Sequence, residues 1–325
     1  MVVNKTRLLP IEKVGAAYCA VTSLLMVVMM SRLVDPVGMA LVRIEWLAMT
    51  LLLAWGTPYL QKHLSSLIPH LSFLIPFLRT VAQMAWLILW YPDTYEFNRC
   101  FANLDHHFAQ LDLTLFGCQP ALEFSQLLSG SVWSEVFCLG YWSYFPMIAL
   151  LSLAVLWKNW QEHDLHTFKA VTTTIMTAFF FYYVIFIFLP VAGPQFYFQA
   201  VGIDEIVQGH FPALGSYFSS HTEMMPSPGN PDGLFYRLVS SAQATGERPT
   251  AAFPSSHIGI STILLMLARR HVPRLLFILL PLWALLCCAT VYIQAHYLVD
   301  GIAGLISAPI ILAMAQATLR CWKIE

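Results

Sequence analysis

Apolar stretches of about 20 residues recur along the chain and alternate with short polar segments. A helix of about 20 apolar residues is long enough to cross the hydrocarbon core of a bilayer. The pattern therefore predicts an all-α fold, a polytopic membrane helical bundle of about eight transmembrane helices. These spans are expected at 14–34, 37–60, 70–91, 133–157, 168–190, 253–270, 275–294 and 300–318.

Composition supports a membrane protein and restricts its partners. Hydrophobic residues make up 58% of the 325 positions and charged residues 11%, whereas a soluble domain carries about 25% charged residues. The net charge of −1 argues against nucleic acid as a partner. The high share of hydrophobic residues makes the lipid bilayer the expected partner. The seven cysteines show no metal-type spacing, and we expect neither a metal nor another cofactor. Cys100 and Cys118 can share an outer loop, either as a disulfide or, more simply, as two free thiols.

The lysines and arginines indicate how the spans are oriented. Cytoplasmic segments of membrane proteins carry an excess of these residues. With the N-terminus inside, eleven of them fall in inner segments and four in outer segments, so both termini are expected to be cytoplasmic. The inner ones are Lys5, Arg7, Lys13, Lys62, Lys158, Lys169, Arg269, Arg270, Arg274, Arg320 and Lys323, and the outer ones are Arg32, Arg99, Arg237 and Arg248.

The first long segment on the expected outer side is 92–132. Apolar residues recur every three or four positions between Phe101 and Leu115. This spacing predicts an amphipathic helix on the membrane surface, ended by Gly117 and Pro120.

A second long outer segment, 191–252, is rich in Gly, Pro, Ser and Asn and is expected to be mostly irregular. A loop of this length in a compact protein is usually functional. We therefore divide the chain into N-terminal transmembrane helices, 1–91, and a core, 92–325, that includes both outer segments.

A histidine and two serines lie at the outer start of the sixth span, in the stretch AAFPSSHIGIS at 251–261. The chain crosses inward after His257, turns and crosses back, so His296 and Asp300 emerge on the same side. Asp300 follows His296 by four residues, which puts both on one face of a helix within hydrogen-bonding reach. Ionisable groups at membrane depth are costly and usually functional, so these three residues are expected to form one site. The alternative is a pair at a helix start that only satisfies its own polar groups.

This set of residues suits nucleophilic phosphoryl transfer. A neutral imidazole can attack phosphorus while a carboxylate holds its other ring nitrogen and stabilises the cation that forms. A second histidine can give a proton to the departing oxygen. Ser255, Ser256 and the backbone amides at the start of that helix can cradle the phosphate oxygens. The phosphate of a lipid lies at the same depth, so we expect a lipid phosphate substrate.

The motifs FPSSH and HYLVDGIAG resemble the second and third motifs of the type 2 phosphatidic acid phosphatase superfamily. FLPVAGPQFYF at 188–198 is similar to a stretch of the branch that includes fungal inositol phosphorylceramide synthase, and LDLTLFGCQPALEF and YWSYFP also resemble that branch. The resemblance covers roughly 90–310. It implies a six-helix phosphatase-like core, metal-independent chemistry and a phosphohistidine intermediate. It also implies His296 as the nucleophile, Asp300 as the residue that orients it, and His257 as the general acid.

The chain departs from the superfamily pattern at its cationic positions. Ser241 stands where the first motif has a lysine, although Arg248-Pro249 follows. Gln195 and Gln294 stand where many members of the branch have an arginine. Arg248 is either a phosphate ligand, because guanidinium suits bidentate contact with phosphate, or a simple loop residue. The two glutamines can donate uncharged hydrogen bonds to phosphate, which suits a phosphodiester as well as a monoester.

Three functions are compatible with the sequence. The first is an integral membrane phosphatase that acts on a lipid phosphate or pyrophosphate, with its active site on the extracytoplasmic face. The second is a phospholipid-headgroup phosphotransferase similar to inositol phosphorylceramide synthase, in which an alcohol acceptor resolves the phosphohistidine. Hydrolysis is the simpler reaction, because it needs no second binding site. The third is a membrane transporter, which predicts ionisable groups near the midplane of several helices. Arg43, Glu45 and Arg79 lie in or near the second and third spans, either as a structural ion pair or on a transport path.

Overall fold

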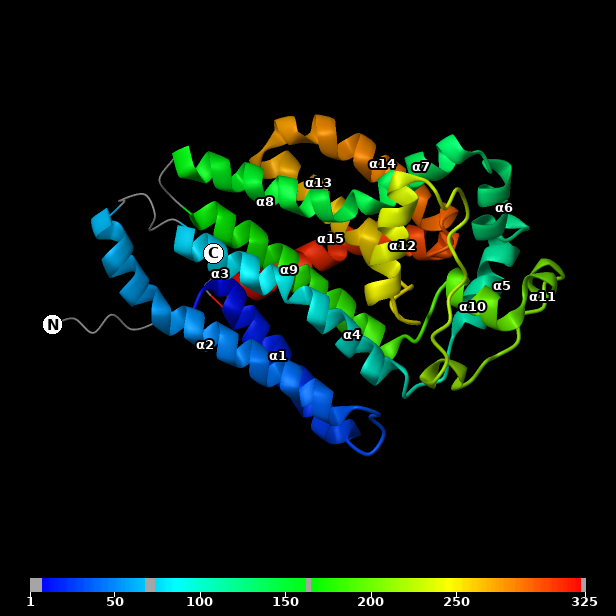
Figure 1. Cartoon of the computed structure of the whole chain (residues 1–325), viewed down its shortest axis with the longest axis horizontal. Coiled ribbons are helices and arrows are strands. Elements are labelled where there is room, and N and C mark those ends of the chain that lie inside the picture. Colours follow the sequence, from blue (N-terminus) through cyan, green and yellow to red (C-terminus); the bar gives the residue numbers. More distant parts are fainter. Residues whose placement is uncertain (1–7, 68–73, 162–164, 323–325) are drawn as a thin grey trace.

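The protein is described by a computed structural model that covers residues 8–67, 74–161 and 165–322 (Figure 1). These residues form helices and, within the described ranges, no strand, which confirms the all-α prediction. The helices are α1 Pro10–Met29, α2 Pro36–Leu67, α3 Leu74–Ala85, α4 Leu87–Asn98, α5 Asp105–Phe116, α6 Pro120–Leu127, α7 Ser131–Trp142, α8 Tyr144–Gln161, α9 His166–Phe188, α10 Pro194–Val201, α11 Ile203–Val207, α12 Leu234–Gly246, α13 Ser256–His271, α14 Leu276–Tyr292 and α15 Leu298–Cys321.

Six helical stretches of the described chain are long and apolar enough to cross a membrane, and a seventh joins α7 to α8 across a 45° bend. The chain is therefore a multi-pass membrane protein, and these seven stretches correspond to seven of the eight predicted spans. The eighth, expected at 253–270, is α13, which has 16 residues. At 1.5 Å per residue it is about 24 Å long, whereas the hydrocarbon core of a bilayer is about 30 Å thick. Helix α13 is thus too short to count as a complete span.

Helix α9 lies at the centre of the bundle and packs against α1, α4, α8, α13 and α15. Most of its side chains are buried, including six of its eight aromatic ones. Phe180, for example, stacks on Tyr18 of α1 with 4.0 Å between the ring centroids. Because three of its neighbours carry residues of the site described below, α9 fixes their relative positions.

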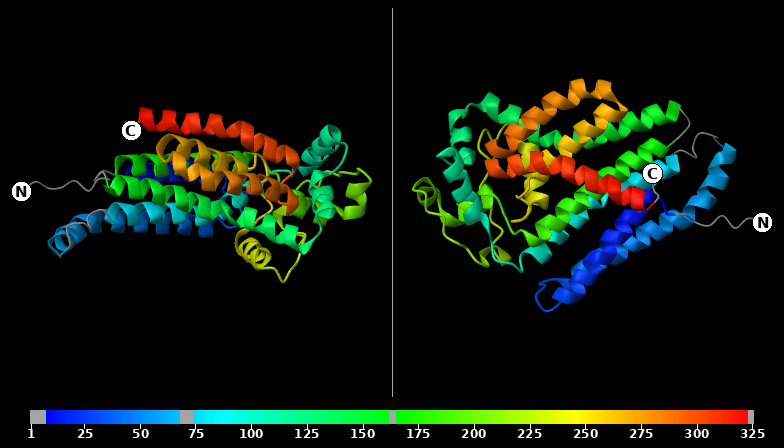
Figure 2. Two further views of the ribbon diagram at one scale, coloured as in Figure 1. Left: turned by 90° about the horizontal axis from the view of Figure 1, so that it is seen from above. Right: turned by 180° about the vertical axis from the view of Figure 1, so that it is seen from behind.

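Helices α13, α14 and α15 bring distant parts of the sequence to one end of the bundle. The chain leaves this end at Ser256, returns to it at Tyr292 and leaves again at Leu298. Helices α13 and α15 approach closely at Gly304, where a Cβ atom would lie 2.6 Å from the carbonyl oxygen of Ser255. Small residues permit this kind of close helix contact in membranes. Helix α1 begins and α15 ends at the opposite end of the bundle (Figures 1 and 2).

Two buried ion pairs connect the N-terminal helices. Arg43 of α2 donates two hydrogen bonds to the carboxylate of Asp93 in α4, both of 2.9 Å. Arg79 of α3 donates to Glu12 of α1. Glu45 is exposed and takes no part in either pair. Arg43 and Arg79 therefore have structural partners, as one of the two sequence interpretations expected, but the acidic partners are not Glu45.

Short helices close the end of the bundle at which α13 begins (Figure 2). Helix α5 ends at Gly117, whose φ of 73° is the left-handed conformation of a helix C-cap, whereas Pro120 begins α6. The face that α5 buries is polar: Asp105 and Asp112 are inaccessible, while Leu115 is 60% exposed. The opposite side of α5 exposes Leu111 and Leu115, so an amphipathic helix that lies on the membrane surface stays a prediction. The two carboxylates are buried because they accept hydrogen bonds from the backbone around the site.

The segment 191–252, expected on the outer side, is more helical than predicted, because it contains α10, α11 and α12. Helix α12 packs against α7. The carboxylate of Glu135 in α7 accepts hydrogen bonds of 3.0 Å from the amides of Phe235 and Tyr236 in the first turn of α12. A carboxylate at this position stabilises the start of a helix. Glu135 and Phe235 are 100 residues apart in the sequence, so the composition of the segment 191–252 could not predict their contact.

Candidate active site

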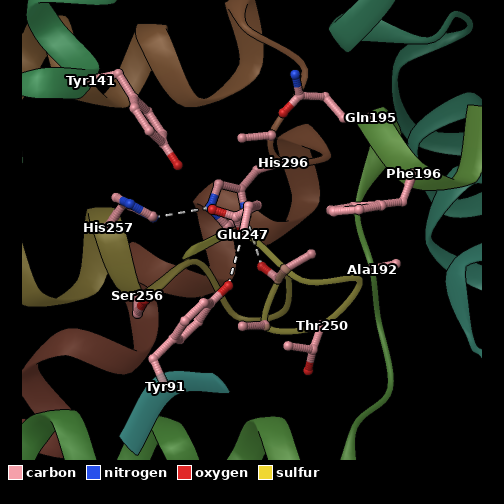
Figure 3. Close-up of a pocket in the computed structure, with 13 residues that line it drawn as sticks. Tyr91, Tyr141, Ala192, Gln195, Phe196, Glu247, Thr250, Ser256, His257 and His296 are labelled. Carbon is pink, nitrogen blue, oxygen red and sulfur yellow. Dashed lines mark hydrogen bonds between the residues drawn. The ribbon is translucent and has the colours of Figure 1, made fainter. Parts of the chain in front are cut away.

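A small cavity lies at the end of the bundle where α13 begins (Figure 3). Five parts of the chain form it: α4, α7, the start of α10, the segment before α13 with the first turn of that helix, and the turn before α15. Among the described residues, no lysine or arginine lines it. Its polar lining residues are Tyr91, Tyr141, Gln195, Glu247, Thr250, Ser256, His257 and His296.

His296 lies in the turn between α14 and α15, where it is 3% exposed. Its Nδ1 atom is 2.8 Å from the carbonyl oxygen of Ala252, so Nδ1 carries the proton and donates it. The other ring nitrogen, Nε2, then carries a lone pair, and it lies 3.4 Å from Nδ1 of His257. Burial lowers the pKa of His296 to about 4, although the Ala252 carbonyl opposes this shift. The ring is therefore neutral near pH 7, as an attack on phosphorus requires.

His257 lies in the first turn of α13 and is held between two aromatic rings. The ring of Tyr141 is 4.7 Å away and that of Tyr144 is 4.5 Å away, measured between centroids. These contacts fix the orientation of the imidazole, so its Nδ1 faces His296 (Figure 3). The structure thus brings together the two histidines that lie 39 residues apart in the sequence.

Asp300 lies one turn after His296, in the first turn of α15. One of its oxygens accepts a hydrogen bond of 2.9 Å from the amide of Tyr297. The same oxygen is 3.7 Å from Nδ1 of His296, which is longer than a hydrogen bond. The direct bond expected from the sequence is therefore not present, because the Ala252 carbonyl occupies the Nδ1 proton. Asp300 thus lies beside the imidazole without a hydrogen bond to it.

The start of α13 provides part of the expected phosphate cradle. Ser256 lines the cavity. Ser255 does not, because its hydroxyl caps the helix by accepting a hydrogen bond from the amide of Ile258, at 3.5 Å. A helix N-terminus attracts anions through its free amides and its dipole. This end of α13 points at the cavity from the side of His257 (Figure 3).

Comparison with protein families gives one decisive result. The family model described as the PAP2 superfamily matches residues 108–314, more than half of the chain. The chain belongs to the PAP2 superfamily. Its members are generally phosphatases and phosphotransferases. Searches of curated proteins and of solved structures found no match. The superfamily resemblance read from FPSSH and HYLVDGIAG is thus confirmed, while the closer resemblance to the inositol phosphorylceramide synthase branch stays a prediction.

Gln195 and Gln294, which stand where many members of the similar branch have an arginine, form hydrogen bonds mainly with other residues of the protein. Gln195 lines the cavity, but its amide group donates to Ser227 and accepts from Gln243, at 3.1 and 2.9 Å. Gln294 does not line it, because its side chain turns toward α6 and donates to Ser125 at 3.4 Å. The uncharged hydrogen bonds expected for phosphate are therefore largely used inside the protein.

Arg248 does not line the cavity either. Its guanidinium donates a hydrogen bond of 2.7 Å to the backbone carbonyl of Glu247. Of the five residues predicted to bind phosphate, the cavity wall includes Ser256 and Gln195. The role of a loop residue is the one that the structure supports for Arg248.

Three polar residues of the cavity wall of this PAP2 protein were not singled out from the sequence: Tyr91, Glu247 and Thr250. Glu247 precedes Arg248, and its carboxylate accepts a hydrogen bond of 2.8 Å from the hydroxyl of Tyr91 in α4. Tyr141 points its hydroxyl toward the two histidines (Figure 3). The only available signal was an acidic residue next to the arginine of a suspected phosphate motif.

Two carboxylates of α5 position the backbone on both sides of His296. Asp105 accepts hydrogen bonds from the amides of Ala192 and Gly193, at 2.7 and 2.8 Å, and from the hydroxyl of Tyr297 at 3.0 Å. Asp112 accepts from the first two amides of α15, at 2.9 and 3.0 Å. Burial raises the pKa of each carboxyl to about 6, while these hydrogen bonds oppose the shift.

Possible metal ligands are dispersed in the described part of the chain. No group of three or more His, Cys, Asp or Glu side chains there could hold a metal ion. Cys100 and Cys118 are separate free thiols, as the simpler interpretation of the sequence expected.

Proposed function

We propose that this PAP2 protein is a membrane phosphatase that cleaves a lipid phosphate or pyrophosphate through a phosphohistidine on His296. The observation that carries the proposal is the pair of histidines in one cavity. The Nε2 lone pair of His296 faces His257 at 3.4 Å, with the proton of the ring held on the other nitrogen. A nucleophile and an acid at this separation can reach the two sides of one phosphate ester bond.

The reaction follows from these positions. Nε2 of His296 attacks phosphorus, the bond from phosphorus to the lipid oxygen breaks, and His257 gives its proton to that oxygen. The negative charge of a bound phosphate favours the protonated form of His257 that this step needs. Asp300 stabilises the positive charge that develops on His296. Water then attacks phosphorus, returns a proton to His257 and releases His296.

The expected side of the membrane follows from the charges at the two ends of the bundle. Lys158, Arg269, Arg270 and Arg274 lie at the helix ends opposite the cavity. The excess of positive charge marks that end as cytoplasmic. The proposal therefore has the site on the extracytoplasmic face, within reach of lipids of the outer leaflet.

The proposal is tested by rapid quench of the purified protein with a phosphorus-labelled lipid phosphate, followed by detection of acid-labile label on the protein. His296→Ala should abolish the label. His257→Ala should reduce labelling from the lipid by about 10²–10⁴-fold, the usual contribution of a general acid. It should largely preserve labelling from p-nitrophenyl phosphate, whose leaving group needs no proton.

A matched control is His107→Ala, since His107 is exposed on α5 and outside the cavity. If His296→Ala is still labelled and His257→Ala is not, the two roles are reversed. Unchanged turnover in both variants would show that the histidines are not catalytic. We also expect activity in the presence of a chelator, and activity that depends on added magnesium or zinc would contradict a metal-independent reaction.

A phosphotransferase is the second candidate, and one observation favours it. The cavity wall contains a carboxylate, Glu247, and no described lysine or arginine, which suits a singly charged phosphodiester better than a doubly charged monoester. Transport has less support. Arg43–Asp93 and Glu12–Arg79 are buried ion pairs, and none of these residues lines the cavity.

A further inference from the structure

The carboxylate of Glu247 is an unexpected component of a phosphate site. It follows α12 directly and lines the same cavity as His257 and His296. One of its oxygens accepts the hydrogen bond from Tyr91, and within the described chain the other has no hydrogen-bond partner. Figure 3 shows this pair on the cavity wall. A phosphate oxygen repels a carboxylate, so Glu247 is not built to bind phosphate.

The chemistry of a carboxylate points to a different ligand. An ionised carboxylate only accepts hydrogen bonds, and each oxygen can accept more than one. A hydroxyl group is the natural donor to it. Thr250, on the same wall, has a buried hydroxyl without a hydrogen-bond partner among the described residues, so the wall offers a second polar contact for such a ligand.

The surroundings of Glu247 strengthen it as an acceptor. Burial raises the pKa of its carboxyl, while the Tyr91 hydroxyl and the charge of Arg248 oppose the shift. A carboxylate with a raised pKa binds hydrogen-bond donors more strongly than an ordinary one. The Tyr91 contact also fixes its orientation, because α4 is anchored against α9.

We infer that Glu247, oriented by Tyr91, binds the hydroxyl of an alcohol that takes the phosphoryl group from His296 in place of water. This inference rests on the phosphohistidine of the proposed function and names the class of acceptor, a neutral alcohol with more than one hydroxyl. One hydroxyl attacks phosphorus while the carboxylate accepts a hydrogen bond from the alcohol. Glu247 is thus a residue that determines acceptor specificity.

The transfer step balances without a further reactant. The alcohol oxygen forms a bond to phosphorus as the bond from phosphorus to Nε2 of His296 breaks, and the nitrogen recovers its lone pair. The proton of the alcohol goes to His257, which gave up a proton to the leaving lipid oxygen in the first step. An acceptor with a carboxylate or phosphate of its own would be repelled by Glu247.

The test measures how the phosphoenzyme divides its phosphoryl group between water and alcohol. The full chain is reconstituted in vesicles with phosphorus-labelled phosphatidic acid and increasing glycerol, and labelled glycerol phosphate and inorganic phosphate are separated. This ratio does not depend on how fast the phosphoenzyme forms. Glu247→Gln keeps the shape and the Tyr91 contact but removes the charge. It should reduce the share of glycerol phosphate about 10-fold, as expected for loss of a hydrogen bond to a charged group.

Two further variants sharpen the result. Tyr91→Phe leaves the carboxylate in place without its orienting contact, so the share of glycerol phosphate should fall by a smaller factor, about threefold. Glu223→Gln alters an exposed glutamate of the same outer segment and should leave the share unchanged. Size-exclusion profiles identify any variant that does not fold. If Glu247→Gln does not fold, the result for Tyr91→Phe decides the test.

The outcomes separate the two proposals. Wild-type protein that forms neither phosphoenzyme nor product contradicts the proposed function. Wild-type protein that forms phosphoenzyme but yields only inorganic phosphate at every glycerol concentration overturns the inference alone. The inference also fails if Glu247→Gln and Tyr91→Phe both divide the phosphoryl group as the wild type does.

Discussion

His296 is kept neutral by burial, and no acidic side chain holds its Nδ1 proton. It is buried in the turn between α14 and α15, and a backbone carbonyl instead of Asp300 takes its Nδ1 proton. A carbonyl fixes the tautomer as well as a carboxylate does, and burial of the ring disfavours its charged form. The imidazole therefore loses its proton far below its ordinary pKa of about 6.5.

The pH dependence of phosphoenzyme formation follows from this shift. The folded pKa of His296 is lowered to about 4, so the reactive neutral form is present at pH 6 to 8 and is lost as the pH falls through about 4. With a p-nitrophenyl phosphodiester, which needs no acid and keeps one charge, the rate of labelling should be flat above about pH 6. Rapid quench across this range checks the expectation. A rate that halves near pH 6.5 would show an ordinary histidine.

At the scale of helices, the geometry of the site depends on how closely α13 approaches α15. Gly304 lies against the Ser255 backbone, whereas Gly301 lies against the end of the flexible Ile258 side chain. A methyl group at position 304 must move one helix, because backbone cannot yield. The same group at position 301 meets an atom that can rotate away.

Gly304→Ala should therefore slow phosphoenzyme formation by about 10-fold or more, since small displacements of reacting groups are costly. Gly301→Ala is the control and should leave the rate within about threefold of the wild type. Both variants should fold, and the rates are measured by rapid quench. Equal rates for the two variants would show that the spacing of α13 and α15 does not limit the reaction.

The sequence predicted the path of the chain through the site but not the contacts that complete it. Hydropathy located α13, α14 and α15, and two crossings were enough to bring His257 and His296 to one end. The Tyr91–Glu247 contact joins residues 156 positions apart. Apolar patterns report which residues avoid water, but they do not tell which buried polar atoms meet. For the same reason the polar face of α5 was unexpected, because Asp105 accepts its hydrogen bonds from a segment 87 residues away.

For the whole molecule, a buried ion pair between Arg43 and Asp93 attaches α2 to α4, which packs on the central helix α9. Arg43→Ala should leave Asp93 as an unpaired buried charge and destabilise the protein by about 3–5 kcal/mol. The measurement is the melting temperature in detergent. Glu45→Ala, on the same helix but exposed, should change it little. The double variant Arg43→Met with Asp93→Leu should recover much of the loss, and a double variant as unstable as Arg43→Ala would contradict this explanation.

The orientation of the whole molecule can be tested with cysteines introduced into a cysteine-free background. Glu223 and Arg269 are both exposed. Glu223 lies two residues before Met225, whose amide donates to the carbonyl of Gln195 at the cavity, whereas Arg269 lies in the last turn of α13, at the other end of that helix from His257. A membrane-impermeant thiol reagent applied to intact cells should label Glu223→Cys at once. It should label Arg269→Cys only after the inner side is opened, because positively charged ends face the cytoplasm. The reverse pattern would place the catalytic cavity inside.

The absence of lysine and arginine from the described cavity wall has a consequence for regulation by product. Inorganic phosphate carries most of a double negative charge at neutral pH and would meet a carboxylate without a cation to balance it. A lipid phosphate brings acyl chains, whose partition into the bilayer holds its phosphate at the cavity. Soluble phosphate has no such anchor. Released phosphate should therefore inhibit the protein weakly, and turnover should continue at high phosphate concentration.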